Sequence, residues 1–350
     1  MASGADVSGR VNETWLAQYR EEIIEPELPI VDPHHHLWSH ADSVYLFPEL
    51  VADLRSGHNI RATVFEECGS MYRAEGPEEL RSLGETEFVT GVATMSASGG
   101  FGAARACAAM VGNVNLLLGA RVEPIFEAHI AASGGRFHAI RFSTAWDANE
   151  RVHKTVPRAE MLADARFREG YQYLARFGLT FDAWVYHPQL GEVAALAAAF
   201  PQTPIVLNHF GSPILGGPNA ARTAEVFAEW RAGMTALARH DNVNVKLGAL
   251  PVRRADARRG AGATPLSSEE IATAWRPYVE VCVEQFGAKR CMFESNFPVQ
   301  KRWCSYAVFW NACKRLAAGA FSSAEAPADE KAALFGKTAA RVYRLPEGLL

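Results

Sequence analysis

The sequence predicts a closed (β/α)8 barrel, and three observations support this prediction. Short apolar or β-branched runs recur eight times along the chain, and stretches with helical periodicity lie between them. The alternation extends over about 260 residues, close to the usual size of such a barrel. No linker divides the series midway and no G-x-G-x-x-G follows an early strand, so an open doubly wound sheet is the weaker alternative.

The positions of the elements follow from the same runs. In chain order, we expect strands at residues 30–31, 63–65, 89–92, 138–141, 181–185, 205–207, 243–247 and 292–293. The helical periodicity predicts helices at residues 161–177, 192–200, 223–239 and 268–285. The last of these helices has a clear start, because Ser267 and Glu270 form the S-x-x-E pattern of a capping box.

The composition indicates a large globular chain that acts on a small molecule. Of the 350 residues, 49% are hydrophobic and 21% are charged, which excludes a disordered or fibrous chain. Lys and Arg number 35 against 39 Asp and Glu, a formal charge of −4, so we expect no general basic surface for nucleic acid or an anionic membrane. We place an N-terminal extension at residues 1–28 and a single barrel domain at residues 29–350.

Targeting and redox signals are absent from the sequence. Residues 1–28 hold no apolar segment of signal-peptide length, and the longest apolar run, residues 193–200, is far shorter than the roughly 20 residues of a membrane helix. The six cysteines form no C-x-x-C pair, which predicts reduced, mostly buried thiols. A catalytic cysteine is the alternative. We expect a cytoplasmic protein without membrane contact, and we allow for a homo-oligomer.

Two histidines follow the first strand on one face. Asp32, His34 and His36 share parity, whereas His35 has the opposite parity, so the three point the same way on an extended backbone. At the C-terminal end of a barrel strand that direction is the mouth, where enzymes of this fold keep their active sites. Neutral imidazoles two residues apart can hold one divalent metal ion or polarise one carbonyl group. The alternative is a surface histidine cluster, which the preceding apolar strand disfavours.

Polar side chains also stand at the ends of six other expected strands. They are Glu66, Glu67, Arg141, His187, Asn208, His209, Lys246, Glu294, Ser295 and Asn296. Their convergence is more informative than any single member, because an isolated histidine is often a satisfied structural residue and a lone Arg or Lys an ion-pair partner. We interpret His58, His129, His138, His153 and His240 as structural.

Aromatic residues near the same strand ends favour a flat ligand. They are Trp38, Tyr72, Trp146, Trp184, Tyr186 and Trp303, and ordinary packing between barrel and helices is the alternative for about half of them. Arg141, or the arginines at 253, 254, 258 and 259 after the seventh strand, could hold a carboxylate in a bidentate pair. We therefore expect an anionic small-molecule substrate.

Three motifs resemble the amidohydrolase superfamily. They are DPHHHLW at 32–38, LNHFG at 207–211 and MFESNFP at 292–298, and the resemblance extends from residue 29 to 345, including a closing helix at 334–343. It is greatest to the TIM-barrel metal-dependent hydrolases that include 2-pyrone-4,6-dicarboxylate lactonases and sugar lactonases. The resemblance implies a site made of His34, His36, His209 and the residue at 296.

The resemblance also implies a divalent ion on His34, His36 and His209. Three neutral nitrogens suit zinc in softness and geometry and leave a position open. A metal-free mechanism, in which the histidines alone polarise the carbonyl, is the alternative, because lactonases that resemble this chain can also work in that way.

Position 296 departs from the superfamily pattern, because asparagine stands where an aspartate is expected. An amide oxygen can accept a hydrogen bond, but it cannot take a proton from water near neutral pH. Glu294, Glu67 and His187 are the alternative bases. We favour Glu67 or His187, because both are expected nearer the rim of the barrel.

The sequence thus predicts a hydrolase that opens a lactone, or a related cyclic ester or amide, of a carboxylated or aromatic small molecule. Asn296 also fits a metal-dependent decarboxylase of an aromatic or unsaturated acid, which needs no base for water. A third alternative is a barrel that only binds its ligand. Product analysis distinguishes the three.

Overall fold

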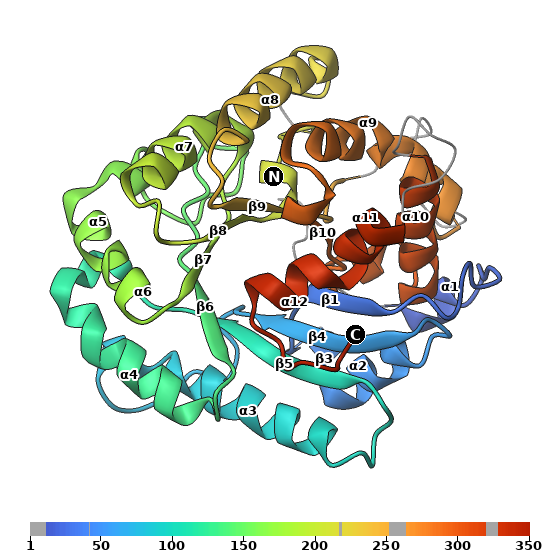
Figure 1. Cartoon of the computed structure of the whole chain (residues 1–350), viewed down its shortest axis with the longest axis horizontal. Helices are drawn as coiled ribbons and strands as arrows, with labels where there is room; N and C mark the ends of the chain where they lie inside the picture. Colours follow the sequence, from blue (N-terminus) through green and yellow to red (C-terminus); the bar gives the residue numbers. More distant parts are fainter. Residues whose placement is uncertain (1–11, 42, 217–218, 252–263, 320–327) are drawn as a thin grey trace.

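The structure is a computed structural model that describes residues 12–41, 43–216, 219–251, 264–319 and 328–350. Eight parallel strands follow one another in chain order around a barrel, and helices surround them (Figure 1). The strands are β1 (Ile30–His35), β4 (Ile60–Glu66), β5 (Arg105–Gly112), β6 (Phe137–Arg141), β7 (Thr180–Ala183), β8 (Ile205–Leu207), β9 (Val243–Leu247) and β10 (Cys291–Phe293). The predicted barrel is confirmed.

Backbone contacts between the first and last strands close the ring. The amide of Asn296 donates to the carbonyl oxygen of His34 at 2.8 Å, and the amide of His36 donates to Phe297 at 2.7 Å. A parallel bridge joins His35 to Phe297 at the same place. The end of β1 and the segment after β10 are therefore held side by side, and these two segments carry two of the motifs found in the sequence.

Helices cover the outside of the barrel. They are α2 (Phe47–Leu54), α3 (Leu83–Ala97), α4 (Glu123–Ala132), α5 (Ala165–Tyr171), α6 (Tyr173–Arg176), α7 (Leu190–Ala199), α8 (Thr223–Leu237), α9 (Ser268–Phe286) and α10 (Tyr306–Gly319). The capping box of α9 forms as predicted, since Ser267 Oγ accepts from the amide of Glu270 and Glu270 Oε2 accepts from that of Ser267. The helix predicted at 161–177 is divided, because Asp164 caps a new start at Ala165.

The prediction of the third strand is wrong. Residues 89–92 lie within α3, where Val89 and Val92 are buried on the same side of the helix. The third strand is β5, an alanine-rich segment that contributes Ala109 and Val111 to the barrel interior. Small side chains suit this interior because they leave room for the larger residues of the other strands, but they give β5 little apolar signal in the sequence.

The N-terminal end of the barrel is closed by the C-terminal segment. It comprises α11 (Ala328–Ala332), the π-helical turn η9 (Ala333–Lys337) and α12 (Thr338–Val342). The hydroxyl of Tyr343 enters the barrel and donates to Asp182 Oδ2 at 2.8 Å. At the other end, a hairpin of β2 (Trp38–His40) and β3 (Ser43–Tyr45) follows β1, and α1 (Glu13–Leu16) precedes the barrel.

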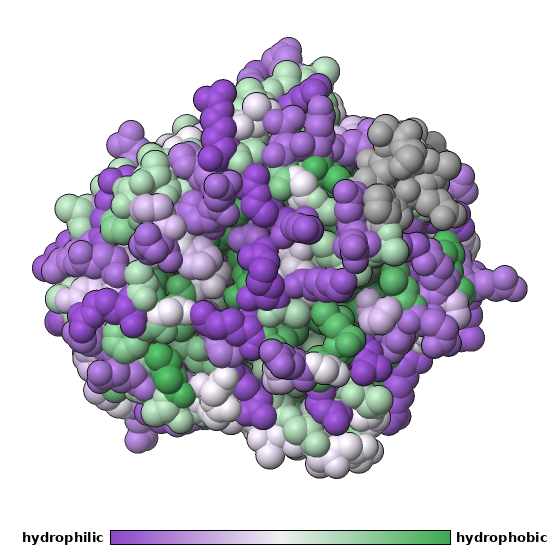
Figure 2. Space-filling model, in the orientation of Figure 1, coloured by the Kyte–Doolittle hydropathy of each residue, from purple (hydrophilic) through white to green (hydrophobic). Residues whose placement is uncertain are grey.

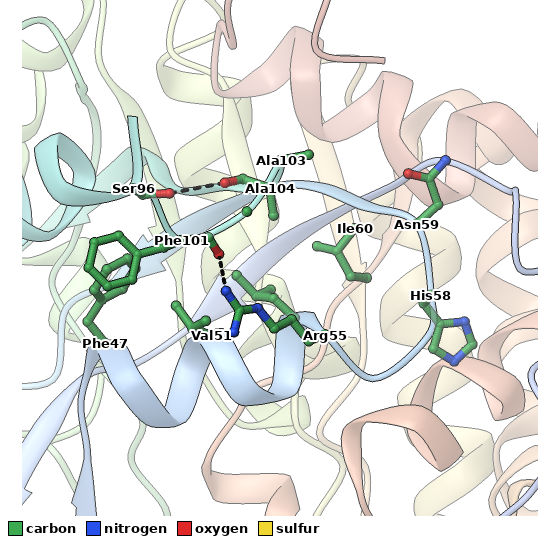
Figure 3. A pocket seen from close by; sticks show the side chains of 12 residues that line it. Phe47, Val51, Arg55, His58, Asn59, Ile60, Ser96, Phe101, Ala103 and Ala104 are labelled. Atoms are coloured by element: carbon green, nitrogen blue, oxygen red, sulfur yellow. Dashed lines mark hydrogen bonds between the residues drawn. The ribbon is translucent and has the colours of Figure 1, made fainter. Parts of the chain in front are cut away.

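Six large hydrophobic side chains are exposed among the described residues. The face shown in Figure 2 is mostly hydrophilic with scattered hydrophobic residues. A groove of about 200 Å³ lies beside the start of β4, between Phe47, Arg55, Ile60 and Phe101 (Figure 3). It lies at the N-terminal ends of the strands, away from the barrel mouth. Within the described residues, no helix combines the length and hydropathy that a membrane crossing requires.

All six cysteines are free thiols, and five of them are buried. This agrees with the reduced, buried thiols expected from their spacing.

Candidate active site

The end of β1 supplies two histidines that face the same space. Nε2 of His34 lies 3.3 Å from Nε2 of His36, and both residues are buried. His35 instead has its Nε2 2.8 Å from Oγ1 of Thr63 on the neighbouring strand. This is the alternation of an extended strand. It separates a pair of histidines at the mouth from one that packs in the wall of the barrel.

His36 is a neutral imidazole with a defined tautomer. Its Nδ1 lies 2.9 Å from the backbone oxygen of Glu66, which can only accept, so Nδ1 carries the proton and Nε2 presents a lone pair. Asn296 places Oδ1 3.1 Å from that Nε2. Burial, and then the charge of Arg141, hold the pKa of His36 well below its usual value.

His209 reaches the same space from the loop after β8. It begins the short turn η5 (His209–Gly211), in which His209 and Phe210 both have the left-handed φ of 56°. The ring centre of His209 lies 4.7 Å from that of His34. Its backbone amide and its Nδ1 both donate to Glu294 Oε1, at 3.1 Å and 2.7 Å. One carboxylate oxygen therefore fixes the backbone and the ring of His209.

Glu294 lies between His209 and His34. Its second oxygen, Oε2, is 2.7 Å from Nδ1 of His34, yet this oxygen makes no hydrogen bond. The side chain is fully buried. From the sequence, we favoured Glu67 or His187 over Glu294 as the base that takes a proton from water. Glu294 follows the end of β10 at Phe293, and the side chains that it meets come from other strands, which the local sequence does not reveal.

Asp32 joins β1 to the segment after β10. Its carboxylate accepts from the amide and the hydroxyl of Ser295, at 3.0 Å and 2.5 Å, and from the hydroxyl of Tyr306 at 2.8 Å. Burial raises the pKa of Asp32 to about 6, although these donors oppose the shift. Asp32 is fully buried beneath the histidines. Its hydrogen bonds hold the end of β1 to the segment after β10.

A buried ion network lies under the histidines. Nζ of Lys246 is 2.8 Å from Glu66 Oε2, 2.7 Å from Asp182 Oδ2 and 3.2 Å from Nδ1 of His34. Burial alone would lower the pKa of Lys246, but Asp182, Glu66 and Glu294 outweigh it and raise that pKa, so the ammonium stays charged. Burial, and then Lys246, hold the pKa of His34 well below its usual value.

Arg141 is held against Glu67 and Trp184 near the histidines. Its Nε donates to Glu67 Oε1 at 2.6 Å, and a terminal nitrogen donates to the Glu67 backbone oxygen at 2.5 Å. The guanidinium lies 5.6 Å from the ring centre of Trp184, whose ring is in turn 6.4 Å from that of His209. The indole of Trp184 therefore has the Arg141 cation and the His209 ring as neighbours.

Comparison with known proteins identifies the family. The amidohydrolase family model matches residues 31–345. The chain belongs to the amidohydrolase family. It is 30% identical over 342 residues to the protein y4mH of Sinorhizobium fredii, which covers 91% of this chain and 99% of that one. It is 35% identical over 184 residues to an L-fucono-1,5-lactonase of Burkholderia multivorans, a match to 53% of this chain and 57% of the lactonase.

One similar solved structure contains a bound zinc ion. It is an amidohydrolase of Burkholderia multivorans with bound zinc, which superimposes with a TM-score of 0.67 at 26% identity over 91% of this chain and 99% of that one. The amidohydrolase family and its relatives named as lactonases show that the chain is a hydrolase enzyme.

The structure does not bring His187 into the histidine cluster. Its Nδ1 accepts from the amide of Ile214 at 3.3 Å, and its Nε2 lies 3.7 Å from Glu229. Glu67 is held by Arg141. Both candidate bases already have partners in this amidohydrolase, and their role in activating water stays a prediction.

The predicted aromatic residues differ in their surroundings. Trp38 stacks on His36, with ring centres 5.8 Å apart, and its Nε1 donates to Ser43. Lys154 lies over the ring of Trp146, and the hydroxyl of Tyr186 donates to the backbone of His153. Tyr72 is 37% exposed and Trp303 packs at the edge of the core. The arginines at 253–259 lie outside the described residues.

The donor set fits a divalent cation. His36 Nε2 and Asn296 Oδ1 are both lone-pair atoms as placed, only 3.1 Å apart, and such atoms repel unless a proton or a cation lies near both. Candidate ligand atoms of His34, His209 and Glu294 lie within 4.8 Å of one another. Glu294 Oε2 is buried without a hydrogen bond. Neutral imidazoles with carboxylate partners are typical surroundings of zinc.

Proposed function

We propose that this amidohydrolase is a lactonase, which opens a lactone or a related cyclic ester or amide of a carboxylated or aromatic small molecule by attack of water. The observation that carries the proposal is the group of imidazoles of His34, His36 and His209 that meet at the barrel mouth. The lactonase relatives support the reaction class. The adjacent Arg141 and Trp184 support an acidic, flat substrate.

We propose that His34, His36 and His209 hold a zinc ion. When bound, zinc supplies a Lewis acid that polarises the substrate carbonyl. Arg141 and Trp184 bind and orient the ring and its carboxylate, while Trp38 packs behind His36. Asn296 Oδ1 can orient water through a hydrogen bond but cannot remove its proton.

Product analysis tests the reaction class. The purified protein is incubated with L-fucono-1,5-lactone and with 2-pyrone-4,6-dicarboxylate, and acid release and the ring-opened product are measured. We expect hydrolysis of one or both lactones. Release of carbon dioxide from a hydroxybenzoic acid would instead support the decarboxylase. If the two lactones and the aromatic acid are all recovered unchanged, the result would support a barrel that only binds its ligand.

Removal of the metal tests the zinc proposal. Exhaustive dialysis against a chelator should abolish lactone hydrolysis, and added zinc should restore it. Elemental analysis of protein purified without chelator should find about one zinc per chain. Full activity in metal-free protein would instead support hydrolysis by the histidines alone. His209 would then be the proton acceptor, because its Nδ1 donates to Glu294.

A further inference from the structure

The segment that carries His209 has a strained backbone. Four consecutive residues, 209–212, have φ between 43° and 68°, and we call them the left-handed turn. Such φ values suit Gly211, but they cost free energy at His209, Phe210 and Ser212, which have a Cβ atom. A strained backbone persists only where its surroundings determine it. Contacts from outside the left-handed turn must therefore hold it.

The side of the left-handed turn that faces the barrel is held by Glu294. Its Oε1 accepts from the backbone amide of His209 at 3.1 Å and from Nδ1 of the same residue at 2.7 Å. These hydrogen bonds orient the first peptide group of the turn and the imidazole. They do not reach the peptide group between Phe210 and Gly211, which is the middle of the turn.

The middle of the left-handed turn is held from outside the barrel by Trp230 of α8. Its Nε1 donates to the carbonyl oxygen of Phe210 at 2.6 Å, and the tryptophan is fully buried. A right-handed Phe210 would direct this carbonyl elsewhere and leave the buried indole donor without a partner, which is unfavourable. The hydrogen bond from Trp230 therefore favours the left-handed form.

Apolar packing surrounds the same turn. The ring of Phe210 packs edge-on against Trp275 of α9, with ring centres 5.8 Å apart. A Cβ atom at Gly211 would lie only 2.8 Å from Cδ2 of Leu190 on α7, so the backbone approaches that helix closely. These contacts fix where the turn lies. Unlike a hydrogen bond, they do not specify the direction of a peptide group.

We propose that Trp230 is a positioning residue for His209, because its hydrogen bond to Phe210 maintains the left-handed turn that brings the imidazole to the barrel mouth. His34 and His36 take their positions from β1, whereas His209 lies beyond the end of β8 and depends on this turn. The inference rests on the proposed function, in which His209 acts at the mouth.

Crystal structures of two variants test the position of His209 directly. Trp230→Phe removes the indole donor and keeps an aromatic ring. Trp275→Phe is the matched control, because Trp275 is also buried and packs on Phe210, but its Nε1 donates to the carbonyl oxygen of Leu250 at 3.0 Å. We expect the left-handed turn to be lost and the His209 ring to move only in Trp230→Phe. An unchanged turn, or an equal change in both variants, would overturn the inference.

Lactone hydrolysis provides a functional measurement. In Trp230→Phe, kcat should fall about 10- to 100-fold. KM should change much less, because Arg141 and Trp184, which are proposed to bind the substrate, lie outside the turn. Trp275→Phe should show a similar fall in melting temperature and keep most of its kcat. An equal loss of kcat in the two variants would mean that Trp230 only stabilises the fold, contrary to the inference.

A glycine at position 212 tests whether the cost of the left-handed turn is what Trp230 offsets. Glycine adopts a left-handed φ without strain, and Ser212 Oγ makes no hydrogen bond that would be lost. The double variant Trp230→Phe/Ser212→Gly should therefore recover part of the lost kcat. No recovery would contradict the proposed role of the turn.

A variant that keeps Trp230 covers the case in which Trp230→Phe does not fold. Ser212→Thr raises the cost of the left-handed turn, because β-branched residues adopt this φ poorly. Hydrogen exchange of the tryptophan indoles is followed by NMR. The indole proton of Trp230 should exchange faster than in the wild type, and that of Trp275 should not. Unchanged exchange at Trp230 would overturn the inference.

These outcomes separate the inference from the proposed function. A left-handed turn that survives in Trp230→Phe, with normal lactone hydrolysis, would overturn the inference and leave the lactonase proposal standing. Displacement of His209 in Trp230→Phe without any loss of hydrolysis would support the control of the turn by Trp230, and it would contradict the role of His209 in the proposed function.

Discussion

At the scale of single residues, a carboxylate, Glu294, directly follows the last strand, and an amide, Asn296, stands two residues later. The sequence identified the departure at Asn296 and named Glu294 as one of three alternative bases. It could not show that Glu294 contacts His34 and His209, because parity gives the direction of a side chain but not its depth or its partners. The pairing of Glu67 with Arg141 joins two strands and has no signal in either segment alone.

Asn296→Asp tests the amide at this position. A carboxylate beside the substrate should repel an acidic lactone, so we expect KM for a carboxylated lactone to rise about tenfold, which corresponds to about 1.4 kcal/mol. A neutral sugar lactone is the control, and its KM should change little. Higher turnover of both lactones, falling at low pH, would instead mean that water activation limits the wild type.

His209→Ala separates chemistry from packing. The His209 side chain is 11% exposed and its partner Glu294 also contacts His34, so the fold keeps most of its contacts. We expect kcat to fall by about 100-fold or more, with a melting temperature close to that of the wild type. A large fall in melting temperature with normal turnover would show that His209 is structural.

At the scale of elements, seven of the eight strands follow from apolar runs in the sequence, and β5 does not. Its alternation is interrupted at Cys107, which has a left-handed φ of 52° and whose amide donates to Thr63. The pairing of β5 with β4 shifts register at this point. A bulge and small alanine side chains together remove the period-two pattern from which a strand is recognised.

The start of α9 offers a prediction at the same scale. Ser267 caps the helix through its hydroxyl, which accepts from the amide of Glu270 at 3.1 Å. Ser267→Ala should lower the free energy of unfolding by about 1 kcal/mol, while Ser267→Thr should retain most of it. Urea denaturation of the three proteins measures this. Equal stability of all three would show that packing alone holds the end of the helix.

At the scale of the whole molecule, the buried polar groups link the closed end of the barrel to the mouth. Tyr343, which follows the last helix, contacts Asp182, which binds Lys246, which in turn contacts His34. The sequence predicted the closing helix and the polar strand ends separately. Their continuity depends on side chains that meet inside the barrel from strands far apart in the chain.

The buried histidines give the fold a defined response to acid. Burial lowers the pKa from 6.5 to about 4 in a set of structural histidines, which are His35, His58, His129 and His138. Burial likewise holds the pKa of His34 and His36 well below 6.5. Between pH 4 and 6.5 the unfolded chain binds protons at these histidines and the folded chain does not, so this contribution to stability is complete above pH 6.5 and is lost as the pH falls toward 4.

Buried carboxyl groups act in the opposite direction, but fewer of them do so. Burial raises the pKa of Asp32 to about 6 and that of Glu66 and Glu85 to about 8, and it also raises the pKa of Asp53 and Glu192. Burial lowers the pKa of a further histidine, His187. Near pH 5.5 the six histidines together with His187 outnumber these five carboxyl groups, so we expect the unfolded state to bind more protons. We therefore expect the urea midpoint to fall as the pH is lowered from 6.5 to 5. In His129→Gln, which removes one of the six titrating groups, the fall should be smaller. A midpoint that stays constant or rises on acidification would show that the carboxyl groups dominate the proton balance.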